Sequence, residues 1–161
     1  MKAAFLAARS AALMAPLLAC LVFAQLLLPT TAHAATTQGS GTRAAESRNV
    51  AEFQAVTLHG SMDLVVRQGA QSVQVQADDN LLPLLETVVE PGSNGSTLVV
   101  RWKKGHSLKT RSKVLVTVSM PKLTALASSG SGDIKLETFS TPALKFAMSG
   151  SGDVRFDKLT T

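Results

Sequence analysis

The chain has 161 residues, of which 45% are hydrophobic, and its 16 basic residues outnumber 11 acidic ones. This modest positive charge, in a sequence without a helical recognition element, does not predict nucleic-acid binding. The single cysteine, Cys20, lies near the N-terminus, so the rest of the chain has neither a disulfide framework nor a thiol nucleophile.

Residues 1–34 have the features of a secretory signal peptide. Lys2 and Arg9 give a positively charged start, residues 11–28 carry no charge, and an Ala-His-Ala sequence ends at Ala34. Small residues at that spacing form a typical cleavage site. We therefore expect cleavage after Ala34 and export to the periplasm or cell surface of a bacterium.

Two alternatives for this segment stay open. The apolar run is 18 residues long, so an uncleaved segment would serve as a membrane anchor. The Leu-Leu-Ala-Cys sequence that ends at Cys20 resembles a lipobox, in which the cysteine would be acylated. In both cases the protein would contact the membrane only through this segment.

The next part of the chain is expected to be irregular before strands begin. Residues 35–47 are rich in Thr, Gly, Ser and Ala without apolar periodicity, which predicts a flexible linker. Apolar and polar residues alternate over 73–76, as in a half-buried strand. Pro83 follows two good helix N-caps, Asp78 and Asp79, so one short helical turn is predicted there.

Strand patterns then continue to the end of the chain. Residues 97–102 form the returning strand of a predicted hairpin, and residues 113–120 alternate in the manner of another strand. Because no long amphipathic helix occurs in this region, residues 48–161 are predicted to form one all-β domain.

A twenty-residue repeat dominates the C-terminal part. The sequence Ser-Gly-Ser-Gly-Asp occurs at 129–133 and again at 149–153, and flanking residues also match, for instance Ile134 with Val154. A repeat of strand, glycine turn and strand predicts stacked units that bury their apolar faces against one another. We predict a β-solenoid, or right-handed β-helix-like stack, with coils of ~20 residues, preceded by a less regular β region. A two-strand unit of an antiparallel meander is the alternative.

The turn residues of this repeat have a structural explanation. Glycine permits positive φ angles and close backbone approach, and Ser and Asp side chains bond to turn backbone. A Gly-Ser-Met-Asp sequence at 60–63 is a degenerate third copy. The residues predicted to form structural turns are Gly60, Asp63, Gly130, Ser131, Gly132, Asp133, Gly150, Ser151, Gly152 and Asp153.

A cation site is the functional alternative for the same turns. Asp133 and Asp153 would lie about 4.8 Å apart in adjacent coils, and calcium would relieve their repulsion. Calcium-binding solenoids usually repeat Gly-Gly-x-Gly-x-Asp every nine residues, a pattern that this sequence lacks. We therefore favour the structural role and predict neither a metal nor another cofactor.

Catalytic motifs do not occur after the predicted signal peptide. His59 and His106 lack the spacing of metal ligands, and the Gly-Ser-Gly turns are not the G-x-S-x-G nucleophile elbow. Paired carboxylates of a polysaccharide-degrading enzyme stay open as an alternative. We predict that the protein is not an enzyme.

A basic stretch is the main candidate for ligand binding. No acidic residue occurs between Glu90 and Asp133. An aromatic residue among basic side chains suits an anionic glycan, lipopolysaccharide or a lipid headgroup. A solvated hairpin tip whose lysines protect a sheet edge is the alternative. The candidate binding residues are Arg101, Trp102, Lys103, Lys104, Lys109 and Arg111.

The sequence from about residue 48 to the C-terminus resembles the head GIN domain of the putative auto-transporter adhesins, formerly a bacterial domain of unknown function. The resemblance rests on residues 49–69, 75–90 and 116–123 and on the paired Ser-Gly-Ser-Gly-Asp turns. It implies an exported β-solenoid-like domain without assigned catalysis. Family members usually carry further coils, whereas this chain reaches Thr161 in the middle of a repeat.

These observations predict a non-enzymatic envelope or cell-surface domain that acts as an adhesin-like binding module or scaffold. Another envelope protein is a further candidate partner. The alternatives are a β-helix protein that binds or degrades polysaccharide and a purely structural envelope protein.

Overall fold

The computed structural model describes residues 36–93 and 95–160, which belong to one compact unit, Ala34–Thr161. This part of the chain is all-β apart from one 3-10 helix, and none of its helical segments is long and apolar enough to cross a membrane. The predicted signal peptide, with Ala34 and Cys20, lies outside the described residues. The elements are β1 (Thr36–Gln38), β2 (Arg43–Arg48), β3 (Ala55–His59), β4 (Asp63–Gln68), β5 (Ser72–Asp78), η2 (Leu82–Leu84), β6 (Leu85–Gly92), β7 (Gly95–Trp102), β8 (Ser107–Lys109), β9 (Leu115–Met120), β10 (Ala125–Ser129), β11 (Ile134–Leu136), β12 (Phe139–Ser140), β13 (Lys145–Ser149), β14 (Val154–Phe156) and β15 (Leu159–Thr160).

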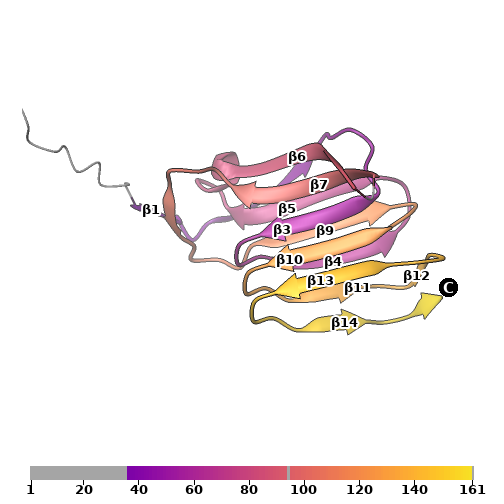
Figure 1. Ribbon diagram of the computed structural model, residues 1–161. Coiled ribbons are helices and arrows are strands. Elements are labelled where there is room, and N and C mark those ends of the chain that lie inside the picture. Colours follow the sequence, from indigo (N-terminus) through magenta and orange to yellow (C-terminus); the bar gives the residue numbers. More distant parts are fainter. Residues whose placement is uncertain (1–35, 94, 161) are drawn as a thin grey trace, which may run out of the picture. The chain divides into compact units, whose positions relative to one another are not determined.

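Two open sheets enclose the core. One has the strand order β13-β10-β3-β7-β6 and the other β14-β11-β4-β9-β5-β2, while β1-β8 and β12-β15 form two small sheets. In Figure 1 the first large sheet lies in front of the second, and the yellow C-terminal strands lie at the same end of both. Alternate residues of each strand point inward, so the core consists of rows of Val, Leu, Ile and Met side chains.

The C-terminal repeats pair in parallel and in register. Leu126 of β10 lies beside Val56 on one side and Phe146 on the other, and Ile134 of β11 lies between Leu64 and Val154. Equivalent positions are therefore adjacent in space, and the degenerate copy at β3 and β4 joins the same rows. These parallel pairs are not those of an antiparallel meander.

The earlier part of the domain follows a different pattern. Strands β6 and β7 pair antiparallel, as do β2 with β5 and β5 with β9. The 20-residue spacing thus describes only the strands from β10 onward, where Leu126 pairs with Phe146 and Ile134 with Val154. Strands β3 and β4 join the same rows in parallel, and their other parallel neighbours are β7 and β9. The other strands form the less regular β region that the sequence predicted.

The prediction of a flexible linker at 35–47 was wrong. Most of this segment forms β1, which pairs with β8, and β2, which pairs with β5. Ala44 packs against the core, and the guanidinium of Arg48 donates a hydrogen bond to the carbonyl oxygen of Leu82 at 2.8 Å. The segment is mostly polar because β2 is an edge strand. Its contact with the core is made by one small apolar side chain, that of Ala44.

The short helical turn around Pro83 is confirmed as η2. Its N-cap residue is Leu81, which makes no side-chain capping hydrogen bond, so neither Asp78 nor Asp79 has the predicted capping role. Leu81 and Leu82 are buried, and the turn thereby covers the core between β5 and β6.

The glycine turns stack directly on one another. Gly130 has a φ of +152°, and a Cβ atom there would overlap the carbonyl oxygen of Gly60. Gly132 approaches the backbone of Met62 in the same way. The aspartates link these layers, since the Asp133 N–H donates to Oδ1 of Asp63 at 3.0 Å and the Asp153 N–H donates to Oδ1 of Asp133 at 3.2 Å.

We expect the substitution Gly132→Ala to lower the free energy of unfolding by about 2 kcal/mol, because the added methyl group overlaps backbone that cannot rotate away. Urea unfolding followed by circular dichroism measures this loss. Gly69→Ala is the matched control, since its Cβ would lie 3.8 Å from the Ser119 hydroxyl, an ordinary contact. Equal losses in both variants would contradict the stacking explanation.

Candidate functional site

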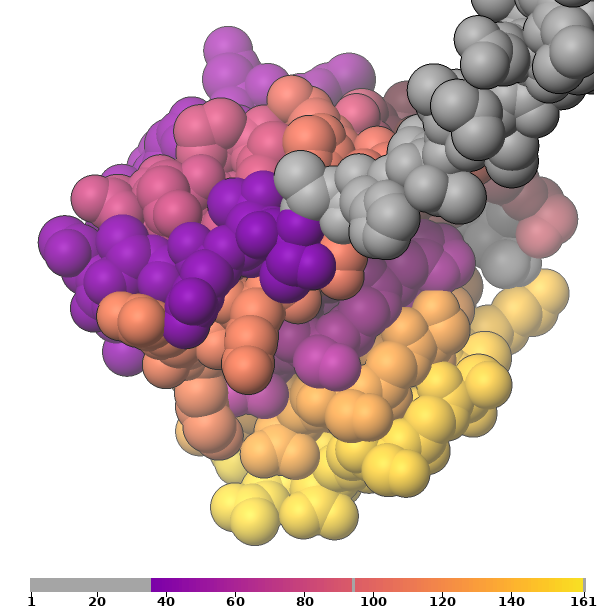
Figure 2. Space-filling view, turned by 90° about the vertical axis from the view of Figure 1, so that its left-hand side faces the viewer, coloured from indigo at the N-terminus to yellow at the C-terminus, as the bar shows by residue number. Residues whose placement is uncertain are grey.

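Two of the predicted binding residues, Trp102 and Lys109, line a shallow groove beside the first glycine turn. Trp102 ends β7, and the chain then runs through β8 to the start of β9. The groove has a volume of about 430 Å³ and is lined by Ser61, Trp102, His106, Leu108, Lys109 and Thr110. Figure 2 faces this side of the domain, where the violet, orange and yellow parts of the chain follow one another as layers.

Trp102 is the aromatic residue that lines this groove. Its ring lies against the first glycine turn, since a Cβ atom on Gly60 would be 3.3 Å from the indole Cδ1. The side chain is half-buried and packs against the core. The indole is therefore held in place by the glycine ladder and presents part of its surface to the groove.

Arg101 forms ion pairs with two carboxylates. Its Nε lies 3.1 Å from Glu86 and its Nη1 lies 2.9 Å from Glu90, both on the adjacent strand β6. The hydrogen bonds that Arg101 donates to Glu86 and, to a lesser extent, to Glu90 raise its pKa. This guanidinium is neutralised within the sheet, so its charge is not available to a ligand in the way that the sequence suggested.

Residues 101–113 are here called the basic loop. A buried carboxylate holds the C-terminal half of this loop. Oδ2 of Asp78 accepts hydrogen bonds from the backbone N–H groups of Arg111 at 2.9 Å and Ser112 at 3.3 Å, and Asp78 is fully buried. The N–H of Arg111 is the main cause that lowers the pKa of Asp78, with help from Ser112 and against the effect of burial. Asp78 thus stays ionised and fixes the position of the loop.

The remaining basic side chains differ in their availability. With its amide oxygen facing Arg111, Gln38 accepts hydrogen bonds from that guanidinium at 3.0 and 3.1 Å. Among the described residues, Lys103, Lys104 and Lys109 are exposed and make no ion pair. These three lysines therefore carry the free positive charge beside Trp102.

The turn aspartates take part in hydrogen bonds between carboxylates and backbone N–H groups of successive layers. Asp63 and Asp133 each accept an N–H from the next layer, as described above, and Asp63 also lies 3.6 Å from the ammonium of Lys113. Within residues 36–93 and 95–160 no three His, Cys, Asp or Glu side chains come together as a metal site. Asp133 and Asp153 have the geometry of a hydrogen-bonded ladder.

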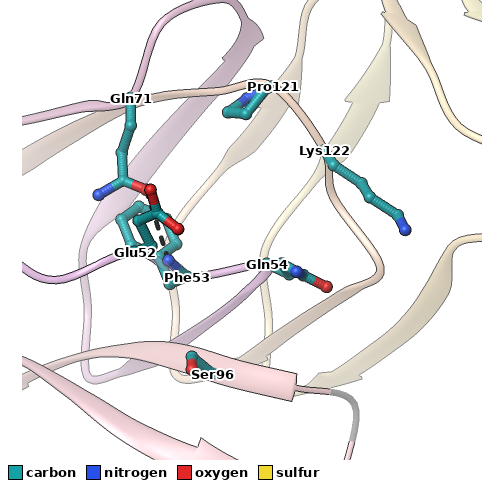
Figure 3. A pocket seen from close by; sticks show the side chains of 7 residues that line it. All are labelled: Glu52, Phe53, Gln54, Gln71, Ser96, Pro121 and Lys122. Carbon is teal, nitrogen blue, oxygen red and sulfur yellow. Dashed lines mark hydrogen bonds between the residues drawn. The ribbon is translucent and has the colours of Figure 1, made fainter.

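A second groove lies at the opposite end of strand β3. It has a volume of about 510 Å³ and is shown in Figure 3, with Glu52, Phe53, Gln54, Gln71, Ser96, Pro121 and Lys122 around it. The Gln71 amide spans this groove, accepting the Phe53 N–H at 3.4 Å and donating to the carbonyl oxygen of Ala51 at 3.0 Å. Because its central polar group is used by local backbone and its two charges are opposite, this groove is the poorer candidate.

Sequence reasoning missed the three acids that shape the basic loop. Glu86, Glu90 and Asp78 lie outside the stretch that lacks acidic residues, and strand pairing brings them back to it. One signal was available, because facing residues of a hairpin interact. In the hairpin of β6 and β7, Glu86 faces Arg101 and Glu90 faces Thr97. No local pattern indicated the role of Asp78.

Two facing sheets, with stacked glycine turns and shallow surface grooves, define the described residues as an all-β domain. The chain belongs to the family described as putative auto-transporter adhesin, head GIN domain, whose model matches residues 52–161. This confirms the resemblance inferred from the sequence. No curated protein is significantly similar to the chain.

Several crystal structures share this fold. A putative adhesin from Bacteroides fragilis has a TM-score of 0.69 and 23% identity, with 77% of this chain and 57% of that chain covered. A putative adhesin from Parabacteroides merdae has a TM-score of 0.59 and 18% identity, with 77% of this chain and 60% of that chain covered. A putative lipid binding protein from Parabacteroides distasonis has a TM-score of 0.52 and 22% identity, with 78% of this chain and 64% of that chain covered. The aligned region therefore spans less than two thirds of each of these proteins, and the likeness establishes the fold.

Acidification tests the role of Asp78. We expect Asp78→Asn to lower the free energy of unfolding at neutral pH by about 1 kcal/mol, because a charge-assisted hydrogen bond becomes a neutral one. The folded-state pKa is depressed below the usual 3.8, so the carboxylate stabilises the fold above that value and loses this effect as the pH falls through the folded pKa. The difference between wild type and variant should therefore shrink below about pH 4 in unfolding curves.

Asp157→Asn is the control, because within residues 36–93 and 95–160 the only ion pair of this exposed carboxylate is with Lys135 at 3.1 Å. Exposed ion pairs contribute about 0–1 kcal/mol. A pH-independent difference for Asp78→Asn would show that the variant acts through packing alone.

Proposed function

We propose that this protein is a non-enzymatic, adhesin-like domain of the bacterial envelope or cell surface that binds an anionic glycan on its basic loop. The observation that carries the proposal is that Lys103, Lys104 and Lys109 are exposed and form no ion pair in the described part of the chain. Lys109 lines the groove together with Trp102, and Lys103 and Lys104 directly follow Trp102 in the chain. Family membership supports the adhesin-like role and a place outside the cytoplasm.

The physical basis is electrostatic attraction combined with an apolar surface. Mobile ammonium groups attract sulfate, carboxylate or phosphate groups without demanding one geometry. The half-buried indole offers a rigid amphipathic face at little entropic cost. Such a site binds through several weak contacts, as suits a repeating polymer such as a surface polysaccharide or lipopolysaccharide.

The stacked region supports a scaffold role for the same domain. We infer that β3, β4 and the strands from β10 onward are coils of a right-handed β-solenoid, since their equivalent residues pair in parallel and in register. A solenoid presents its turns as a continuous ridge. The basic loop lies beside the first of those turns, which places the ligand against the side of the stack.

Charge reversal at Lys103 and Lys104 tests the proposal, with heparin as the anionic glycan. Trp102 is the only tryptophan in the chain, so its fluorescence reports binding at the groove directly. We expect Lys103→Glu/Lys104→Glu to weaken heparin binding about tenfold at low ionic strength, and added salt to weaken binding by the wild type.

The double variant Lys122→Glu/Lys158→Glu changes the net charge equally and serves as the control, because both lysines are exposed and lie outside the basic stretch of residues 101–113. Equal weakening in the two double variants would attribute binding to net charge and remove the groove from the proposal. Binding to phosphatidylglycerol vesicles without binding to heparin would assign the loop to lipid headgroups. Release of reducing ends from acidic polysaccharides would overturn the non-enzymatic assignment.

A further inference from the structure

A second groove of interest lies on the outer face of the sheet β14-β11-β4-β9-β5-β2, which is the rear sheet of Figure 1. Alternate residues of β4, β5 and β9 fill the core, so the residues between them point away from it. The groove has a volume of about 490 Å³, and none of the residues that line it belongs to the basic loop. Its outward-facing residues are Ser47, Arg67, Ser72, Gln74, Thr117 and Ser119.

Strand pairing arranges these side chains in two rows. Gln74 of β5 lies between Ser47 of β2 and Thr117 of β9. The neighbouring row consists of Ser72, Ser119 and Arg67. Adjacent strands are ~4.8 Å apart, and positions two residues apart along a strand are separated by about 6.7 Å. The rows therefore form a grid, which we call the polar grid, whose members are close enough for one small molecule to contact several of them.

The uncharged members of the polar grid have no partner within the protein. In residues 36–93 and 95–160, no side-chain hydrogen bond is made by Ser47, Ser72, Gln74, Thr117 or Ser119. Facing Ser and Thr residues of a sheet can hydrogen-bond to each other, yet Ser72 and Ser119 do not. Thr117 and Ser119 are half-buried. Their hydroxyl groups are therefore available to a ligand in the groove.

The polar grid has one free cation at its border. Arg67 is exposed and forms no ion pair in the described part of the chain. Arg48 also lines the groove, but its Nη2 lies 3.3 Å from Glu46 and donates to the carbonyl oxygen of Leu82 at 2.8 Å. Among the described residues, no acidic or aromatic one lines the groove. The groove thus offers a single guanidinium, whose fork of donors matches a carboxylate.

The uncharged character of this area is local. Beyond Val65 the same outward row continues with Lys135 and Arg155, and Lys135 pairs with Asp157 at 3.1 Å. An ordinary solvated surface carries interspersed charges of both signs, as that part of the sheet does. The polar grid instead presents hydroxyl and amide groups, which both donate and accept hydrogen bonds. Sugar hydroxyl groups have the same two capacities, so the grid matches a sugar.

We propose that the polar grid is a second binding site, for a carboxylate-bearing sugar, a hexuronic acid residue within a polysaccharide. The guanidinium of Arg67 binds the carboxylate, and the hydroxyl groups of Thr117 and Ser119 bond to those of the sugar ring. Because no aromatic residue supplies a stacking surface, each sugar residue binds weakly. A repeating polymer, which engages the site many times, is therefore the occupant.

Trigalacturonic acid tests this proposal by isothermal titration calorimetry. Its full methyl ester is the matched ligand, because it keeps the hydroxyl groups and lacks the negative charge. We expect the acid to bind at least about fivefold more tightly than the ester, and Arg67→Gln to remove this advantage. Thr117→Val keeps the shape of the side chain and removes its hydroxyl group, and should weaken binding of both ligands about two- to fivefold.

Arg155→Gln is the control variant, since it changes the net charge equally. Arg155 is exposed, lies on the same sheet outside the groove, and forms no ion pair within the described residues. Equal weakening by Arg67→Gln and Arg155→Gln would attribute binding to net charge and overturn the proposal. Equal affinity for acid and ester, or no binding of either, would also overturn it. Urea unfolding establishes that each variant is folded, so that unchanged binding by Thr117→Val would count against the polar grid.

The variant Lys103→Glu/Lys104→Glu separates this site from the basic loop. At physiological ionic strength, where distant charges are screened, we expect it to bind trigalacturonic acid within about twofold of wild type. Amide cross-peaks of residues 72–74 and 117–119 should shift in nitrogen-15 correlation spectra on titration. Loss of binding in the lysine variant, with unchanged binding by Arg67→Gln, would place the sugar on the basic loop and overturn the second site alone. Failure of heparin to bind the lysines would overturn the first site without affecting this one.

Discussion

The close approach of backbone to backbone at the glycine turns is the constraint on which the repeat region depends. The α-carbon of one turn lies over the carbonyl oxygen of the turn before it, a distance that no Cβ atom permits. This contact allows only one register between layers. That register in turn places Leu126 and Ile134 in the core and Lys135 outside, so packing and surface charge both follow from it.

The same stacking gives the aspartates of the turns a structural role. The carboxylates of Asp63 and Asp133 each accept a backbone N–H from the layer that follows. A carboxylate that accepts such a bond is already partly compensated. Peptide dipoles therefore relieve part of the repulsion between successive aspartates.

The charges of the proposed binding surface are arranged by the irregular part of the domain, while the first glycine turn supports its indole. Asp78 is buried at the end of β5 and holds the loop through the backbone of Arg111, while Glu86 and Glu90 remove Arg101 from the exposed charge. A stretch that is uniformly basic in sequence thus becomes a smaller patch of three free lysines beside a fixed indole. Family membership and the shallow form of the groove agree with binding at a surface.

The sequence by itself determined the all-β class, the family and the pairing of repeat positions, because glycine turns and alternating side chains are local consequences of residue type and period. It also located Trp102 and its basic neighbours. Only the tertiary structure decided which of those charges are free, since Glu86 and Glu90 reach Arg101 through strand pairing and Asp78 reaches its loop across 33 positions of the chain. Strands β1 and β2 were likewise decided by partners distant in sequence, β8 and β5. Pairing partners that are far apart leave no periodic signal, because each strand is selected for its neighbour in space rather than along the chain.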